Sequence, residues 1–230
     1  VVRMRLAELT AEEGDHAAAV KMAEDAVAGD APRSLLVRFA DLARQSDDAA
    51  AAERAYTRLE AALGDGDDSA PLRATLLVAR AELRLQAKDW DGAAPLMQRA
   101  LALRPNDPTI LNFVGYSALE RRIDVDRALG QIEAAWKAEP QNASITDSLG
   151  WAYFLTGRTD KAVELLEQAQ QGEPENAVIV EHLGDAYWKA GQRFRARYTW
   201  RAAALLAEED MAARVAAKLE DGLTPQTTAP

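Results

Sequence analysis

The sequence Leu149-Gly150-Trp151-Ala152-Tyr153 recurs 34 residues later as Leu183-Gly184-Asp185-Ala186-Tyr187. Each copy is followed, at the same spacing, by a glycine, an alanine, a large residue and a second alanine: Gly157 and Gly191, Ala162 and Ala196, Leu166 and Trp200, Ala169 and Ala203. Self-similarity at a fixed period of this length is typical of a chain built from small stacked units. Because small and apolar residues recur every three to four positions, each unit is predicted to be helical.

These positions resemble the tetratricopeptide repeat (TPR), a pair of helices with the pattern W-x-x-L-G-x-x-Y, then A-x-x-x-F, Ala and Pro. Each position has a physical reason. Gly or Ala in the first helix lets the second approach closely, Gly157 permits the left-handed turn between them, and Pro174 stops the second helix. The resemblance implies an all-α fold, a right-handed α-solenoid of helix-turn-helix units.

Weaker copies lie upstream in the same phase, and we expect about six units. One has an extra residue in its turn at 122–125, and another has Arg80 where leucine is expected. We predict TPR-like units at 1–68, the first beginning inside its own helix pair, and a divergent unit at 69–106. Three units follow at 107–208, then a capping helix at 209–221 and a disordered tail at 222–230. The acidic loop at 63–71 is predicted to divide the chain near Pro71.

Composition supports this architecture and excludes several classes of function. Alanine, the strongest helix former, fills 49 of 230 positions. The absence of cysteine excludes disulfides and thiol chemistry. A net charge of −10 argues against nucleic acid as a partner. No apolar stretch of about 18 residues occurs, so we expect no membrane insertion by this segment.

No arrangement of residues predicts catalysis, a metal site or a cofactor, and we expect none of the three. His182 and Asp185 lie three residues apart on one predicted helix, but no nucleophile accompanies them. The loop at 65–69 resembles a calcium loop weakly, because Ala70 and Leu76 stand where Gly and Glu are required. A structural or groove-lining histidine and a solvated acidic loop are therefore the favoured interpretations.

The resemblance also implies a binding surface, because the first helices of TPR units line a concave groove. Their groove-facing positions in the last three units form an aromatic strip edged by carboxylates: Asn112, Tyr116, Asp147, Trp151, Phe154, Glu181, Asp185 and Trp188. Such a strip favours a segment that carries Lys or Arg, or the amide groups of an extended peptide. Phe154 and Trp188 also suit packing between units.

A basic cluster opens the last predicted second helix, at Arg193, Arg195, Arg197 and Arg201. Two interpretations stand: a docking patch for an acidic partner or phosphate, or a solvated outer face that supports Glu208 and Glu209. The second is favoured, because one short cluster on an acidic chain is not a nucleic-acid footprint.

We therefore predict a non-catalytic scaffold or adaptor that holds a protein or peptide segment in the groove. Two alternatives are a self-assembling structural protein that forms homo-oligomers through open repeat faces, and a helper module of a larger enzyme or protease complex. The run 112–206 is similar to bacterial TPR proteins that are exported or lipid-anchored. This similarity implies a periplasmic or outer-membrane-associated location and leaves a cytoplasmic one open.

Overall fold

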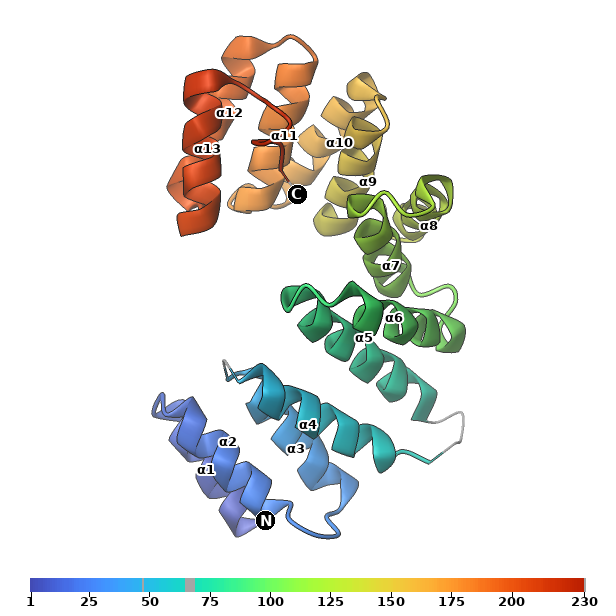
Figure 1. The fold of residues 1–230 in the computed structure, drawn as a ribbon, viewed down its shortest axis with the longest axis vertical. Coiled ribbons are helices and arrows are strands. Elements are labelled where there is room, and N and C mark those ends of the chain that lie inside the picture. Colours follow the sequence, from blue (N-terminus) through green and yellow to red (C-terminus); the bar gives the residue numbers. More distant parts are fainter. Residues whose placement is uncertain (47, 65–68, 230) are drawn as a thin grey trace. The chain divides into compact units, whose positions relative to one another are not determined.

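The computed structural model describes residues 1–46, 48–64 and 69–229, and these residues form an all-α solenoid of paired helices (Figure 1). The acidic loop residues 65–68 lie outside the described residues. The helices are α1 (Val2–Glu12), α2 (His16–Ala26), α3 (Arg33–Arg44), α4 (Ala49–Ala61), α5 (Ala70–Gln86), α6 (Trp90–Leu103), α7 (Pro108–Glu120), α8 (Val125–Ala138), α9 (Ala143–Leu155), α10 (Thr159–Gly172), α11 (Ala177–Lys189), α12 (Arg193–Leu206) and α13 (Glu209–Asp221).

Short polar residues begin many of these helices. Asp107, Asn142 and Asn176 accept hydrogen bonds from backbone N–H groups in the first turns of α7, α9 and α11. Such side chains satisfy N–H groups that have no partner within the helix. The repeats therefore place a capping residue before each of the three helices that carry the predicted binding surface.

The turns between paired helices follow the predicted glycine pattern in the last two units. Gly157 and Gly191 have φ of 81° and 78°, a left-handed conformation that costs glycine little. Lys88 and Arg122 adopt the same region in the turns before α6 and α8, with φ of 59° and 55°. The extra residue of the fourth unit is absorbed by Asp124, which also has a positive φ.

The chain divides into two compact units, Val1–Pro105 and Asn106–Pro230. This boundary is not the predicted one near Pro71. In the first unit, Leu76 of α5 belongs to the same buried cluster as Leu59 and Leu63, at the end of α4. The acidic loop therefore connects helices that share one core, and residues 69–105 belong with the N-terminal repeats.

Arg80 explains why the third unit departs from the repeat pattern. Its guanidinium bonds Glu53 at 2.8 Å and Glu60 at 2.5 Å, and its side chain is largely buried. Arg99 also bonds Glu60, at 2.5 Å. An ion-pair cluster thus occupies the place where other units have leucine, which removes that sequence signal while keeping α5 packed on α4.

In the second unit, α7, α9 and α11 pack side by side, and each pairs with the helix that follows it. We call the surface of α7, α9 and α11 turned away from α8, α10 and α12 the A-helix face. Gly184 allows α11 and α12 to approach, since a Cβ atom there would lie 2.3 Å from the Trp200 ring. Gly150 allows the equivalent approach of α9 to Leu166.

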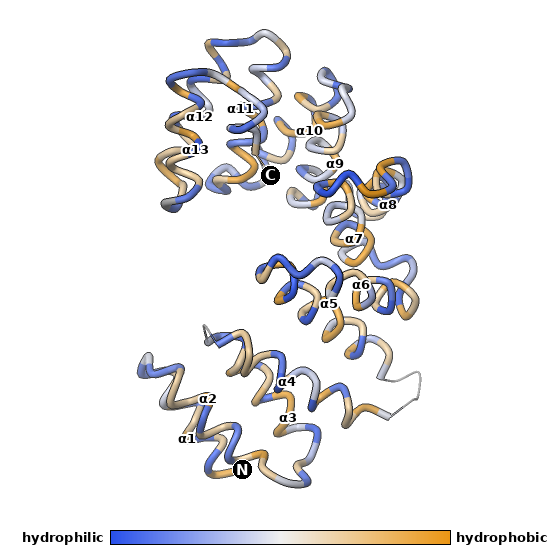
Figure 2. The backbone as a smooth tube through the Cα atoms, viewed as in Figure 1, coloured by the Kyte–Doolittle hydropathy of each residue, from blue (hydrophilic) through white to orange (hydrophobic). Residues whose placement is uncertain are grey.

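Apolar residues are interspersed with polar ones along the helices (Figure 2). None of the helices in the described part of the chain is both long and apolar enough to cross a bilayer.

The segment after α13 differs from its prediction. It was expected to be disordered over 222–230, but residues 222–229 fold back along the second unit, as Figure 1 shows for the end of the chain. Ala229 is 6% exposed and belongs to a buried cluster with Trp151 and Trp200. We call residues 222–229 the C-terminal segment.

Candidate functional site

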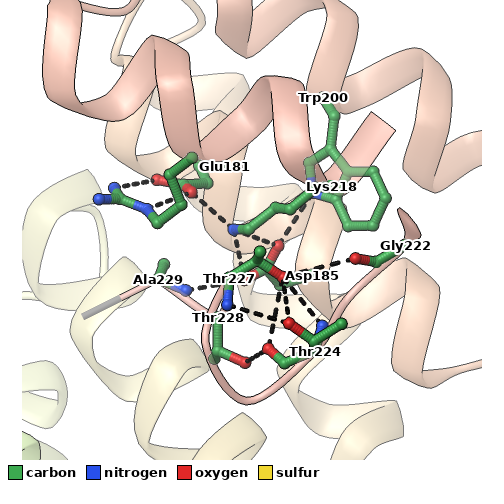
Figure 3. A network of polar contacts seen from close by, with 10 residues as sticks. Glu181, Asp185, Trp200, Lys218, Gly222, Thr224, Thr227, Thr228 and Ala229 are labelled. Atoms are coloured by element: carbon green, nitrogen blue, oxygen red, sulfur yellow. Dashed lines mark hydrogen bonds and ion pairs between the residues drawn. The ribbon is translucent and has the colours of Figure 1, made fainter. Parts of the chain in front are cut away.

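A buried network of charges joins α11 to α13 at one end of the A-helix face (Figure 3). The Lys218 ammonium group donates to Glu181 at 2.6 Å and to both oxygens of Asp185, at 2.7 and 2.8 Å. Arg214 donates two further hydrogen bonds to Glu181, at 2.8 and 2.7 Å. The side chains of Lys218 and Asp185 are fully buried. Removing such charges from water is costly, so the network depends on every partner being present.

Burial and pairing act in opposite directions on the two carboxyl groups. Burial raises the pKa of Glu181, but hydrogen bonds and charges from Arg214 and Lys218 more than offset it, so that pKa lies below its ordinary value. Burial dominates at Asp185, whose pKa lies above its ordinary value although Lys218 lowers it. Glu181, which has two cationic partners, is therefore the more firmly ionised of the two.

Asp185 also holds the C-terminal segment. Its carboxylate accepts a hydrogen bond from the Trp200 indole at 2.9 Å and one from the backbone N–H of Ala229 at 3.1 Å. Figure 3 shows Ala229 and the Thr224–Thr228 turn beside this carboxylate. Asp185 thus links three elements, namely α12, α13 and the C-terminal segment.

A second buried group lies between α9 and α11. His182 Nδ1 lies 2.9 Å from Asp147 Oδ1, and its ring stacks on Trp151 with ring centres 4.1 Å apart. Trp151 stacks on Phe154 on its own helix, at 4.4 Å. His182 therefore pairs with Asp147 rather than with Asp185, its neighbour along α11.

Three polar atoms on the A-helix face are buried without a hydrogen-bond partner in the structure: Asn112 Oδ1, Trp151 Nε1 and His182 Nε2. They come from α7, α9 and α11. Because a buried polar atom without a partner is costly, a further hydrogen bond to any of these three atoms would be favourable.

The sequence profile of the tetratricopeptide repeat family matches residues 37–108 and 117–177, which together make up more than half of the chain. The chain belongs to the tetratricopeptide repeat family. TPR proteins are generally non-catalytic scaffolds for protein interaction. Groups of His, Cys, Asp or Glu able to hold a metal ion are absent from the described part of this TPR chain.

Solved TPR structures share this fold at low sequence identity. The APC/C hetero-tetramer Cut9-Hcn1 aligns with a TM-score of 0.74 and 18% identity over 96% of this chain, which spans only 42% of that protein. A tetratricopeptide repeat protein from Parabacteroides merdae has a TM-score of 0.74 and 15% identity, covering 95% of this chain and 84% of that one. PilW, a type IV pilus biogenesis factor, has a TM-score of 0.67 and 17% identity over 85% of this chain and 88% of its own. No curated protein sequence matches the chain.

The structure places all eight predicted groove residues on the first helices of the TPR units, but it buries most of them. Asp147, Trp151, Phe154, Glu181 and Asp185 have partners within the chain and are less than one-tenth exposed. Asn112, Tyr116 and Trp188 are half-buried. Burial raises the pKa of Tyr116 well above its ordinary value. The charge of Glu120 and a hydrogen bond to Glu120 raise it further.

Sequence reasoning on the TPR pattern missed Arg214 and Lys218 and the role of the C-terminal segment. A signal was present, because Arg214 and Lys218 follow Glu181 and Asp185 by 33 residues each, close to the repeat period. The capping helix therefore presents cations one repeat after the carboxylates, four residues apart on one side of a helix.

The arginine cluster of α12 also has partners other than the predicted ones. Arg195 bonds Glu167 at 2.7 Å, and Arg193 lies over the Trp188 ring with its guanidinium carbon 3.8 Å from the ring centre. Arg197 donates to the backbone oxygen of Leu219. Three of the four arginines thus fasten α12 to α10, α11 and α13.

Proposed function

We propose that this TPR chain is a non-catalytic scaffold that holds a segment of a partner protein on the A-helix face of its second unit. The observation that carries the proposal is that a peptide segment already lies there, with its backbone N–H on the Asp185 carboxylate. A surface that accepts one such segment has the shape and the hydrogen-bonding groups to accept another.

The half-buried residues are the ones placed to contact a partner. Tyr116 and Trp188 offer aromatic area, which carries much of the binding energy in protein interfaces. Asn112 has a buried carbonyl oxygen without a hydrogen-bond partner in the structure. Trp151 and Asp147 lie beneath this surface, because other residues of the chain bury both of them. Their predicted direct contact with a partner stays a proposal that depends on movement of the chain.

Site-specific photo-crosslinking tests the proposal. A photoreactive amino acid at position 112, on α7, is expected to capture a protein that the same group at the exposed position 164, on α10, does not. The affinity of that protein is then expected to fall at least about tenfold with Tyr116→Ala and to be unchanged with Glu164→Ala, helical content being equal. A partner captured equally from both positions, or insensitive to Tyr116→Ala, would contradict binding at the A-helix face.

A second candidate function, self-association, is favoured by one observation in the first unit. Val2, Leu6 and Leu9 lie on one stripe of α1 and are 83%, 52% and 40% exposed. Exposed apolar stripes are common at sites of association. Sedimentation velocity at several concentrations distinguishes the candidates, because a monomer at every concentration excludes this one. If association is seen, Leu6→Glu is expected to abolish it.

A further inference from the structure

The C-terminal segment lies on the same face that we propose for partner binding. Gly222 begins it with φ of 82°, and a Cβ atom there would lie 2.1 Å from the Trp188 ring. Only glycine therefore allows the chain to leave α13 and turn back closely past Trp188. The position of the segment is set by this one residue and by Ala229, which donates its N–H to Asp185.

Between these two points the segment stabilises its own shape. The Thr224 N–H donates to Thr227 Oγ1 at 2.9 Å, and the Thr227 N–H donates back to Thr224 Oγ1 at 3.2 Å. The Thr228 hydroxyl donates to the Thr224 carbonyl oxygen at 2.8 Å. The segment is thus a compact turn that carries no charged side chain.

The segment does not fill the face. A cavity of about 550 Å³ lies between it and the helices, lined by Leu119, Glu120 and Leu155 on one side and by Pro225, Thr228 and Ala229 on the other. This pocket is partly open to solvent. A partner segment that reached into this pocket would bury apolar surface that the C-terminal segment leaves uncovered.

The Asp185 carboxylate keeps its other hydrogen bonds when the C-terminal segment leaves. Asp185 keeps its bonds to Lys218 and to the Trp200 indole, which come from α13 and α12. The carboxylate therefore stays compensated when Ala229 leaves, and it stays oriented to accept another N–H. What holds the segment is its attachment to α13, which gives it a high effective concentration at the site.

From these observations we propose that the C-terminal segment is a built-in, displaceable ligand of the A-helix face. The ligand class is an uncharged, turn-forming peptide that donates a backbone N–H to Asp185, and a partner segment of this class binds by replacing the C-terminal segment. This inference rests on the proposed function, because it concerns the same face.

An NMR titration of the full chain tests the proposal, with the indole N–H signals of Trp188 and Trp200 as reporters. The probe is a synthetic peptide with the sequence of residues 222–230. Gly222→Val prevents the turn past Trp188 and should release the segment. Gly29→Val is the matched control, because Gly29 also has a positive φ of 84° but open space around it.

The peptide is expected to bind the Gly222→Val chain at least about tenfold more tightly than it binds the wild type or the Gly29→Val chain. A peptide with proline at the position of Ala229 lacks the N–H donor, and it should bind the Gly222→Val chain at least about tenfold more weakly. Ala229→Pro in the full chain is a second way to release the segment, for use if Gly222→Val loses helical content.

Equal binding of the peptide to wild type and to both released chains would overturn the proposal, as would no binding to a released chain that keeps its helical content. An unchanged affinity of the proline-containing peptide would overturn the role of Asp185. These outcomes leave the proposed function standing if a crosslinked partner remains sensitive to Tyr116→Ala and binds wild type and Gly222→Val equally.

Discussion

Two junctions in the second unit, both made by α11, use different chemistry at matching repeat positions. Between α9 and α11, the Asp147 carboxylate meets one group, His182, whose charge depends on pH. Between α11 and α13, Glu181, which is equivalent to Asp147, meets Arg214 and Lys218, whose charges are permanent near neutral pH.

The two junctions show how a repeat protein can end its array. A junction between two full repeats has aromatic rings on both sides, so a single ion pair supplements stacking of Trp151 with Phe154 and His182. The junction to the cap uses a lone helix of small residues, and four charged side chains supply the specificity. We therefore expect the α11–α13 junction to be the more sensitive to loss of a charge.

The largest loss of stability is expected for Lys218→Met, because this substitution leaves Asp185 buried without its cation. Breaking a buried pair in this way costs about 3–5 kcal/mol in the free energy of unfolding. Urea unfolding followed by circular dichroism measures it, with Lys137→Met as the control because Lys137 is exposed on α8. A loss below about 1 kcal/mol would show that the network contributes little.

The next largest loss of stability is expected for Gly184→Ala. The added Cβ atom would meet the rigid Trp200 ring at 2.3 Å, whereas in Gly150→Ala it would meet Leu166 Cγ at the longer distance of 2.7 Å. Overpacking of a filled core costs about 1–3 kcal/mol, and we expect Gly184→Ala to be the more destabilising in urea unfolding. The opposite order would mean that Trp200 moves more easily than Leu166.

Asp147→Asn is expected to reduce stability by about 1 kcal/mol, and by more at pH 5.5 than at pH 8. Burial lowers the pKa of His182, but Asp147, by charge and hydrogen bond, with the charges of Asp185 and Glu181, raises it above 6.5 overall. Burial raises the pKa of Glu120 on α7, and the charges of Arg121 and His182 offset this rise in part. The histidine's contribution is therefore fully present below pH 6.5 and is lost as the pH rises through the raised pKa.

The measurement for Asp147→Asn is urea unfolding at both pH values, with the exposed Glu164→Gln as the control. An equal loss at pH 5.5 and pH 8 would mean that protonation of His182 does not contribute.

The smallest loss of stability is expected for Glu167→Gln. Glu167 accepts a hydrogen bond from Tyr187 at 2.7 Å and pairs with Arg195, whose side chain is half exposed. Pairs in contact with water contribute about 0–1 kcal/mol, so the unfolding midpoint should shift little and less still in high salt. A loss comparable to that of Lys218→Met would remove the contrast between buried and exposed pairs.

The repeat pattern predicted the fold because it is local. The Leu, Gly and Ala of each unit report which helix faces meet, and the spacing from Gly150 to Gly184 sets the register of successive pairs. The pattern is weakest where a different interaction replaces a repeat position, as Arg80 does with its two carboxylates. The boundary between the compact units was not predicted, because shared cores depend on contacts rather than on loop composition.

The candidate site was predicted only in outline. The sequence placed the carboxylates of Asp147, Glu181 and Asp185 on the first helices and indicated that they favour cations and backbone amides. That those cations and that amide come from the same chain required the path of residues 209–229, which no repeat position specifies. The burial of Trp151 likewise depends on His182, 31 residues away, whose ring stacks on it.

The turns at Lys88 and Arg122 have a consequence for motion. They are non-glycine residues in a left-handed conformation, which costs about 1 kcal/mol each. These turns belong to the helix pairs α5–α6 and α7–α8, on either side of the boundary after Pro105. Because stability varies along a chain, backbone amides in these two pairs should exchange with deuterium before those of α9–α12, so the repeat array is expected to open first at its middle.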